Sequence, residues 1–296
     1  MHGLIGVDIG GTHIKMAAFS PDGEMLANWH RETGDQPTEG VPAFAETVRQ
    51  MLREVAASDA RIGIAAPGVV AKDNRSIAFQ PGKMYGIEGL DWTAFLERQH
   101  VVPVINDANA ALLGERWRGA AIGASDAILL TLGTGVGGAI LSDGRLLTGA
   151  IGRAGHLGHI SLADSDELSI FGTPGALEPA IGNYSIGKRS GGRFPTTRKL
   201  VEAHLAGDTA ASELWLKSVR MLARAITSFI NILDPEVVII GGGIAKAGAA
   251  LFAPLASYLD EMEWRPDGHH VRVVPAALSE WAGACGAVWN AQHQPA

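Results

Sequence analysis

The chain opens with a short apolar run that carries an aspartate and is followed by two glycines, Leu-Ile-Gly-Val-Asp-Ile-Gly-Gly-Thr at residues 4–12. The apolar run predicts a buried strand, and the glycines predict a turn too tight for residues with a Cβ. A second apolar run from Ile14 to Phe19 follows, and Pro21-Asp22-Gly23 closes it as a turn. The glycines therefore lie between two predicted strands, which excludes Rossmann and P-loop motifs because both need a helix after the turn.

The turn at residues 10–12 carries groups that suit a phosphate. Its backbone N–H groups and the hydroxyl of Thr12 are expected to point at one spot, close to the carboxylate that the strand delivers at Asp8. Proteins hold a phosphate with such donors, next to a carboxylate that binds a metal. The first hairpin is therefore predicted to bind a phosphate group.

A second hairpin of the same kind follows much later in the chain. The apolar run at residues 127–132 leads into Gly-Thr-Gly-Val-Gly-Gly at residues 133–138, then into a second run at residues 139–141 and a turn at residues 142–144. One such turn alone is typical of an ordinary hairpin. The matched pair predicts an internal repeat, with two related domains that face each other across a cleft.

The composition excludes several classes of protein. The 296 residues are 47% hydrophobic and 19% charged, which is ordinary for a globular protein, and the length allows two domains. The net charge of -7 speaks against nucleic-acid or membrane-surface binding, and no apolar run is long enough to span a bilayer. No leader is recognisable, and the single cysteine, Cys285, excludes an internal disulfide and is expected to be a small packed residue. A cytoplasmic protein is expected.

The remaining pattern predicts alternating strands and helices in two domains. A small α/β domain is expected at residues 1–118 and a larger one at 119–282, with the last helix, at about 283–296, packing back on the first domain. Further helices are predicted at residues 38–57, 92–99, 108–116, 208–233, 247–261 and 283–292, and further strands at residues 61–65, 101–105, 237–240 and 271–275.

Five motifs occur in a fixed order: DIGGT at residues 8–12, INDANAA at 105–111, GTGVGG at 133–138, IGGG at 240–243 and AGACGA at 282–287. This order resembles the actin-like ATPase superfamily. Within it, GHLGH at residues 155–159 and GTPGALE at 172–178 resemble the signature of the ROK family of sugar kinases and sugar-responsive repressors. The resemblance implies a two-domain, ribonuclease-H-like α/β fold with the active site in the cleft, and transfer of phosphate from ATP to a hexose, at its 6-hydroxyl. It also implies a homodimer.

The resemblance assigns the catalytic step to Asp107, as the base that takes the proton from the sugar 6-hydroxyl. Such a base typically contributes about 10²–10⁴-fold to the rate. The residues alone leave open that Asp107 is the N-cap of the helix that begins near Ala108. By resemblance, Asn106 binds sugar hydroxyls and Gly68 lets the backbone approach the sugar. The alternative for Asn106 is a turn residue.

The resemblance also assigns the nucleotide and its metal. Asp8 is expected to hold Mg²⁺ through water, since phosphoryl transfer depends mainly on positioning and on neutralising charge. The glycine turns alone could be ordinary hairpins, the later triple glycine a tight β–α turn, and Lys15 a solvated strand residue. The residues expected to bind the phosphates and adenosine of ATP are Gly10, Gly11, Thr12, Lys15, Gly133, Thr134, Gly135, Gly137, Gly241, Gly242 and Gly243.

The chain departs from the ROK pattern at its zinc site. The pattern carries three cysteines that bind a structural zinc together with the last histidine of the GHLGH motif, but Ser169, Phe171 and Ala176 stand in those positions here. No zinc site is therefore expected, and apolar packing by Phe171 and Ala176 is expected to replace the metal. His159 and Glu178 are sugar ligands by resemblance, although without zinc His159 could be a structural histidine.

A second departure concerns the sugar. His156 stands where the family pattern has a sugar-binding glutamate, and it could contact the sugar or point away. A neutral imidazole donates one hydrogen bond and accepts one, whereas a carboxylate only accepts, so the preferred sugar changes with this residue. Glucose is the default, with N-acetylmannosamine, allose, mannose or an amino sugar as alternatives. ATP or polyphosphate as donor is also open.

Two other functions are alternatives to a sugar kinase. A sugar-responsive repressor of the ROK pattern carries an N-terminal helix-turn-helix segment, for which a first strand beginning at Leu4 leaves no room. A non-catalytic sugar-binding regulator would explain the altered zinc loop as a sign of lost activity. The intact Asp107 and the two glycine turns argue against that second alternative.

Overall fold

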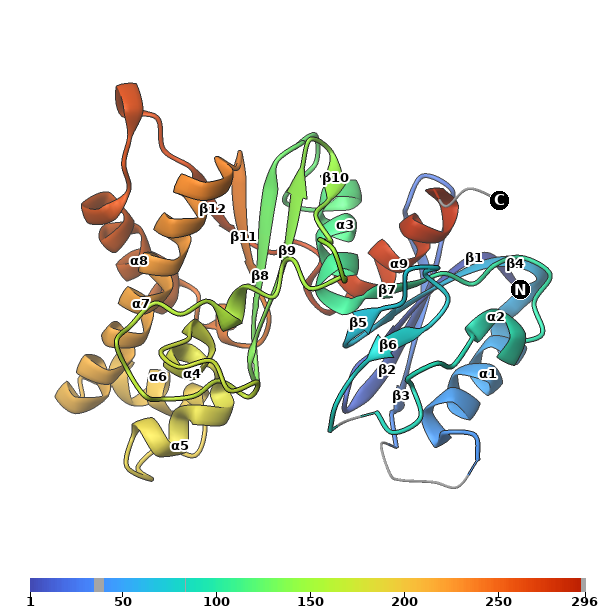
Figure 1. Cartoon of the computed structure of the whole chain (residues 1–296), viewed down its shortest axis with the longest axis horizontal. Helices are drawn as coiled ribbons and strands as arrows, with labels where there is room; N and C mark the ends of the chain where they lie inside the picture. The colour runs from blue at the N-terminus through green and yellow to red at the C-terminus, as the bar shows by residue number, and fades with distance from the viewer. Residues whose placement is uncertain (35–39, 83, 294–296) are drawn as a thin grey trace. The chain divides into compact units, whose positions relative to one another are not determined.

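The computed structural model describes residues 1–34, 40–82 and 84–293. The chain divides into two compact units (Figure 1). Unit 1 consists of Met1–Gly123, Thr148–Ala154 and Ala277–Ala296, and unit 2 of Ala124–Leu147 and Gly155–Ala276. Unit 1 is thus built from three separate stretches of the chain, and most of unit 2 lies between the second and the third.

Unit 1 is built on a five-stranded sheet in the order β3-β2-β1-β4-β7. Strand β1 pairs antiparallel with β2 and parallel with β4, and β4 pairs parallel with β7. The carboxyl ends of β1, β4 and β7 therefore lie at one edge of the sheet, where their polar residues gather. The strands are β1 His2–Ile9, β2 His13–Phe19, β3 Met25–Glu32, β4 Ala56–Ala66 and β7 Val104–Asn106.

Unit 2 repeats this topology in full. Its sheet has the order β10-β9-β8-β11-β12, with β8 antiparallel to β9 and parallel to β11, and β11 parallel to β12. The repeat that the sequence indicates for one hairpin therefore extends to a whole sheet. The strands are β8 Ala127–Leu132, β9 Val136–Ser142, β10 Arg145–Leu146, β11 Val237–Gly241 and β12 Arg272–Pro275.

The two faces of the unit 1 sheet are covered by different means. On one face, Ile5, Val7 and Ile9 of β1 are fully buried in the cluster that contains the apolar side of helix α1, Ala43–Val55. The other face of β1 carries Gly6, and the backbone of helix α9, Ala282–His293, packs there. A Cβ on Gly6 would collide with the carbonyl oxygen of Ala284. Alternation along a strand thus sends bulky residues to one face and a glycine to the other.

Helix α9 also packs closely on helix α3, Asp107–Arg118. A Cβ on Gly286 would collide with the carbonyl oxygen of Ala110, and a Cβ on Gly114 would collide with that of Ala282. The small residues of the AGACGA motif therefore serve close helix packing, and the buried Cys285 is one of them.

The core of unit 2 is organised around the long helix α7, Thr209–Leu233. Asp208 caps the helix by accepting a hydrogen bond from the N–H of Ala211 at 2.8 Å. The apolar side of α7 packs in one cluster with strand β8 and with helix α8, Ala249–Met262. Trp215 is fully buried there and donates its indole N–H to the carbonyl of Ala250 at 2.8 Å.

Shorter elements complete the two units. They are β5 Val69–Val70, β6 Ile77–Phe79, α2 Trp92–Phe95, α4 Leu177–Ile181, α5 Ile186–Arg189 and α6 Thr197–Leu205, with 3₁₀ helices at Leu157–His159, Asn183–Ser185, Ile244–Ala247, Pro266–Gly268 and Ser279–Trp281.

The predicted elements are correct in type but wrong at several ends. The helix predicted at 38–57 begins at Ala43 after the extended Pro42 and ends at Val55, because strand β4 starts at Ala56; Thr38 lies outside the described residues. The helix predicted at 92–99 ends at Phe95, and Glu97 adopts a left-handed backbone with φ of 53°. The strand predicted at 101–105 is confined to Val104–Asn106, where it pairs with β4.

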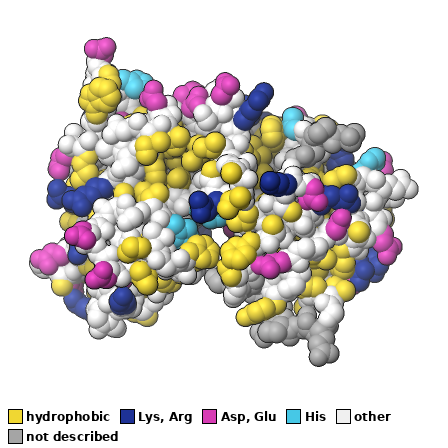
Figure 2. All heavy atoms as spheres, viewed as in Figure 1, with side chains coloured by type: hydrophobic (Ala, Val, Ile, Leu, Met, Phe, Trp, Pro, Cys, Tyr) yellow, Lys and Arg dark blue, Asp and Glu magenta, His cyan; other side chains and the backbone are white. Residues whose placement is uncertain are grey.

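The surface carries charges of both signs. Figure 2 shows acidic and basic side chains interspersed over the face drawn, without a continuous basic patch there. In the described part of the chain, no helix combines the length and the apolar character that crossing a membrane requires.

Candidate functional site

Unit 1 places Asp8 and Lys15 side by side. Asp8 lies near the end of β1, directly opposite Lys15 on β2, so both side chains project from the same face of the sheet. Helix α9 leaves room for the carboxylate at Gly283, where a Cβ would come within 2.7 Å of Asp8 Cγ. Burial and the nearby Asp107 carboxylate raise the pKa of Asp8 to about 7, against the opposing effect of Lys15. Lys15 Nζ also lies 3.9 Å from Glu280 Oε2.

The turn at residues 10–12 is held from β3 by a residue that the sequence did not indicate. Thr33 follows β3 and is 1% exposed. Its hydroxyl donates to the carbonyl of Gly10 at 2.6 Å, and its N–H donates to the carbonyl of Thr12 at 3.0 Å. No motif marks Thr33, because its role depends on the pairing register of β2 with β3.

The expectation that this turn excludes a Cβ is wrong for Gly11. Gly11 has no positive φ, and a Cβ built on it would meet no atom within 4 Å. The same holds for Gly133 and Gly243. The chain's own packing therefore does not require glycine at these positions, and the backbone there is open to a ligand.

Asn106, and not Asp107, caps helix α3. Asn106 ends β7, and its side-chain oxygen accepts hydrogen bonds from the N–H groups of Ala108 at 3.0 Å and Asn109 at 3.2 Å. The alternative that Asp107 is the N-cap is therefore wrong; Asp107 is the first helical residue, is exposed, and accepts from the N–H of Ala108 at 2.9 Å. Asn106 also donates to the carbonyl of Gly68 at 3.1 Å, and Gly68 needs glycine because its φ is +109°.

The second glycine turn joins β8 to β9 in unit 2. Its carbonyls at Gly133 and Thr134 accept hydrogen bonds from the N–H groups of Asn183 at 3.0 Å and Tyr184 at 2.9 Å. Gly135 has a packing reason for lacking a side chain, because a Cβ there would collide with the Glu178 carboxylate. Burial and the nearby Glu178 raise the pKa of Tyr184 to about 12, so its phenol stays protonated near neutral pH.

Glu178 links this turn to the segment that carries His159. It is 3% exposed; Oε1 accepts from the N–H of Val136 at 3.1 Å and Oε2 from that of Ile170 at 3.4 Å. Oε2 also lies 3.8 Å from His159 Nδ1, which has no hydrogen-bond partner among the described residues. Burial lowers the pKa of His159 more than Glu178 raises it, which favours a neutral imidazole.

Two kinds of contact stabilise the loop in which Ser169, Phe171 and Ala176 replace the cysteines of the ROK pattern. Ala176 is 2% exposed, whereas Phe171 is 54% exposed and touches the ring of His159 at a centroid distance of 4.7 Å. Ser169 Oγ accepts from the N–H of Thr173 at 3.1 Å, and Ser161 Oγ donates to the carbonyl of Pro174 at 2.8 Å. Both apolar packing and hydrogen bonds thus hold this loop, whereas the sequence predicted apolar packing alone.

His156 lies next to His159. The two rings are stacked with their centroids 6.5 Å apart, and His156 is half-buried. The loop after β11 lies beside the second glycine turn, because β11 and β8 are parallel neighbours. Gly242 in that loop has a φ of +85°, and a Cβ on it would collide with the carbonyl oxygen of Leu132.

Each unit thus gathers one set of the residues singled out in the sequence. Within unit 1 these are Gly68, Asn106 and Asp107, together with the first glycine turn, Asp8 and Lys15. Within unit 2 these are Gly133, Thr134, Gly135 and Gly137, the loop Gly241–Gly243, and the group His156, His159 and Glu178.

Comparison with known proteins gives consistent results over the whole chain. The glucokinase of Thermotoga maritima is 33% identical over 305 residues, which cover 96% of this chain and 95% of the relative. The N-acetylmannosamine kinase of Escherichia fergusonii is 29% identical over 98% of both chains. The crystal structure of a ROK family glucokinase from Streptomyces griseus, in complex with glucose and AMPPNP, superposes with a TM-score of 0.79 at 27% identity, covering 98% of this chain and 99% of that one.

The ROK hexokinase structure from Thermus thermophilus superposes with a TM-score of 0.79 at 29% identity, covering 96% of both chains. The fold class predicted from the motifs, an actin-like α/β fold, is confirmed by these two solved structures. The model of the ROK family matches residues 4–294, nearly the full length. The motifs, the duplicated sheet and these relatives agree, and the chain belongs to the ROK family.

Proposed function

We propose that this chain is an ATP-dependent hexose kinase that transfers the γ-phosphate of ATP to the 6-hydroxyl of glucose. The observation that carries the proposal is Asp107, an exposed carboxylate at the start of a helix that Asn106 already caps. A carboxylate at this position is not needed for the helix to begin, and it lies at the sheet edge that also carries Asp8 and the open glycine turn. The full-length likeness to the Thermotoga maritima glucokinase supports the same activity.

In this proposal Asp107 accepts the proton of the sugar hydroxyl as that hydroxyl attacks the phosphate. A general base must reach the proton it removes at hydrogen-bond distance. Asn106 has one amide N–H left for the sugar after donating the other to Gly68. Each Glu178 oxygen accepts one backbone N–H, which leaves each oxygen room for a sugar hydroxyl, and His156 and His159 complete the sugar ligands.

The glycine turns serve the nucleotide. The open backbone at Gly11, Gly133 and Gly243 would let phosphates and adenosine approach the chain directly. Thr12, Lys15 and Thr134 add a positive charge and two hydroxyls as further ligands. Backbone donors and one cation are sufficient for phosphoryl transfer, since the reaction depends mostly on positioning and charge stabilisation.

The residues present fit a magnesium ion. The carboxylates of Asp8 and Asp107 lie close enough that Asp107 helps to raise the pKa of Asp8, and a divalent cation relieves such repulsion. Asp8 would hold Mg²⁺ through water, which suits an ion that keeps several waters. When bound, Mg²⁺ supplies positive charge to the phosphates.

N-acetylmannosamine is the second candidate substrate, because the relative from Escherichia fergusonii is named for that sugar and His156 alters the sugar ligands. Polyphosphate is the alternative donor. The homodimer that the ROK resemblance implies stays a prediction, which light scattering tests directly.

The test is release of ADP, followed across a panel of hexoses and amino sugars. Glucose is expected to give the highest kcat/KM, and Asp107→Asn is expected to lower kcat by about 10²–10⁴-fold with little change in KM. Asp59→Asn, at an exposed aspartate of β4, is the matched control and should leave both parameters unchanged. Absence of turnover with every sugar, or an Asp107→Asn variant as active as the wild type, would contradict the proposal.

A further inference from the structure

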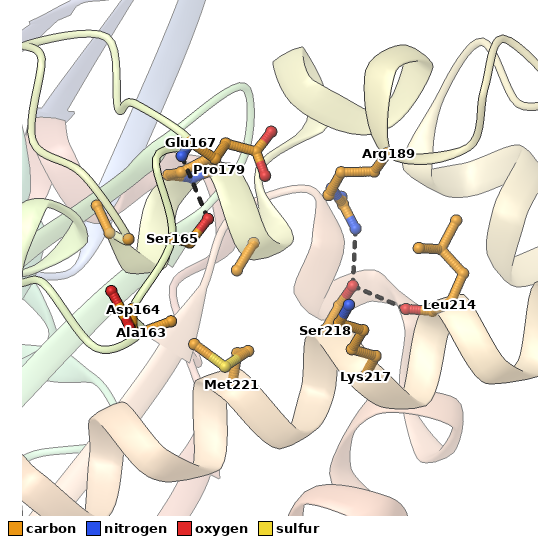
Figure 3. A pocket seen from close by; sticks show the side chains of 13 residues that line it. Ala163, Asp164, Ser165, Glu167, Pro179, Arg189, Leu214, Lys217, Ser218 and Met221 are labelled. Atoms are coloured by element: carbon orange, nitrogen blue, oxygen red, sulfur yellow. Dashed lines mark hydrogen bonds between the residues drawn. The ribbon is translucent and has the colours of Figure 1, made fainter.

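Unit 2 contains a cavity that none of the proposed kinase residues lines. Its volume is about 450 Å³, within the range of small-molecule sites. One wall is the loop at residues 163–176, and helix α4 contributes Pro179 and Ala180. Arg189 of α5 and the residues Leu214, Lys217, Ser218 and Met221 of α7 form the other side (Figure 3).

The helical side of the cavity carries a cation that the chain does not neutralise by direct contact. Arg189 donates from Nε to Ser185 Oγ at 3.0 Å, from Nη1 to Ser218 Oγ at 2.7 Å and from Nη2 to the carbonyl of Gly182 at 3.2 Å. Figure 3 shows its guanidinium reaching toward Ser218 at the cavity. Among residues 1–34, 40–82 and 84–293, no carboxylate forms an ion pair with it. Burial lowers the pKa of Arg189 to about 10, although Glu167 on the loop wall is near enough to oppose this effect. A guanidinium has five N–H groups, so two remain for a ligand.

Lys217 adds a second positive charge on the same side. It is exposed, it precedes Ser218 on α7, and no carboxylate of the described residues is within ion-pair distance of it. On the loop wall, Glu167 acts electrostatically on Arg189 but is shared with Lys188, whose Nζ lies 3.5 Å from Glu167 Oε1. Asp164 on that wall is exposed to solvent. The helical side therefore attracts a negatively charged ligand.

The rest of the lining indicates that the ligand is more than a bare ion. Ala163, Ala176, Pro179 and Ala180 present carbon atoms, and Leu214 and Met221 do so from α7. A cavity of this size and lining would leave much of its apolar surface wet if it held only a small inorganic anion. An organic body would cover that surface.

We propose that this cavity binds a small organic anion, with its carboxylate or phosphate at Arg189 and Lys217 and its organic body against the apolar lining. Ser218 positions the guanidinium, since its hydroxyl accepts from Arg189 and donates to the carbonyl of Leu214 at 3.0 Å. The ligand would touch both segments that hold Glu178. Ala176 and Pro179 flank Leu177 and Glu178 in the chain, and Ile170, in the same loop, donates its N–H to Glu178 at 3.4 Å. Occupancy is therefore expected to change the KM for the sugar more than kcat. The expected change in KM rests on the proposed kinase function, whereas binding of the anion does not.

Binding is measured by calorimetry with three probes: glucose 6-phosphate, citrate and inorganic phosphate, at constant ionic strength. Saturating glucose and AMPPNP are present so that the proposed catalytic residues are occupied. At least one organic anion is expected to bind with one-to-one stoichiometry and at least about tenfold more tightly than inorganic phosphate. The comparison of glucose 6-phosphate with citrate shows whether the head group is a phosphate or a carboxylate.

Arg189 donates hydrogen bonds to three neighbouring groups, so replacing it could weaken anion binding simply by disturbing the fold. Lys217→Met removes an exposed charge, and Leu214→Trp fills the cavity; each should weaken binding at least about tenfold without changing kcat. Lys199→Met, on the exposed face of α6, is the control and should bind as the wild type does. Equal binding by all three variants, or no saturable binding of either organic anion, would overturn the site. Binding without any change in the KM for the sugar would overturn its link to Glu178.

Discussion

At the scale of single residues, the glycines of the two glycine turns and of the loop after β11 are there for different reasons. Gly135 and Gly242 lack a side chain because a Cβ would collide with Glu178 and with the backbone of Leu132. Gly11 and Gly133 have open space in front of them and no positive φ. The sequence presents all four as equivalent turn residues, and only the packing separates those that the fold needs from those whose surroundings are open.

Gly11→Ala tests this distinction. The added methyl meets no atom within 4 Å, so the free energy of unfolding should stay within about 0.5 kcal/mol of the wild type. The affinity for ATP should fall roughly tenfold or more, because the methyl occupies the space into which a phosphate would come. Calorimetry and denaturant unfolding measure the two effects. Gly3→Ala, which also meets no atom within 4 Å, should change neither, and an unchanged ATP affinity for Gly11→Ala would count against the phosphate role.

The lowered pKa of His159 predicts how the stability of the fold depends on pH. Burial holds its pKa below the ordinary 6.5, with Glu178 opposing this effect and His156 adding to it. The unfolded chain therefore binds more protons than the folded one as the pH falls through about 6.5, and stability should decrease there. Urea unfolding between pH 5.5 and 7.5 should show this loss, and His159→Gln should reduce it. His100→Gln, at an exposed histidine, is the control and should leave the pH dependence of stability unchanged. If His159→Gln also leaves it unchanged, the buried neutral imidazole is not the source of that dependence.

At the scale of elements, the duplicated sheets carry different chemistry at equivalent positions. In unit 1 the penultimate pair of the first hairpin is Asp8 opposite Lys15, and in unit 2 the corresponding pair is Thr131 opposite Gly137. Both copies keep the open glycine, but only the first keeps the charges. The copy in unit 1 is thus suited to a metal and to phosphates. The copy in unit 2 adds backbone donors, and the carboxylate beside it, Glu178, comes from helix α4 and not from the hairpin itself.

The contact of α9 with α3 predicts a cost for filling its glycines. In Gly286→Ala the methyl would collide with the carbonyl oxygen of Ala110 and approach the N–H of Gly114 to 2.8 Å, and neither backbone can move cheaply. Overpacking of this kind typically costs about 1–3 kcal/mol, which denaturant unfolding would measure. Gly187→Ala in helix α5 is the matched control, because its Cβ meets no atom within 4 Å. A variant at Gly286 as stable as this control would contradict the close packing.

At the scale of the whole molecule, the sequence predicted the strands and their order better than the contacts between them. The hairpins and the apolar strands after them follow from periodicity and turn residues, and these local signals place β1, β2, β8, β9 and β11 correctly. Thr33, the cap at Asn106 and the contact of Glu178 with Gly135 depend on which strand pairs with which, and no local pattern encodes them. The end of α1 was misplaced because the pairing of β4 with β1 overrides the helical pattern near Ala56.

The three-part construction of unit 1 has a consequence for its synthesis. Helix α9, which covers the glycine face of the first sheet, leaves the ribosome after every element of unit 2. At roughly 5–20 residues per second, on the order of ten seconds or more separates the emergence of that sheet from that of its cover. Unit 2 can complete its own core in this interval, while one face of the N-terminal sheet stays exposed to water and to other nascent chains. The sheet of unit 1 is therefore made before unit 2 but completed after it.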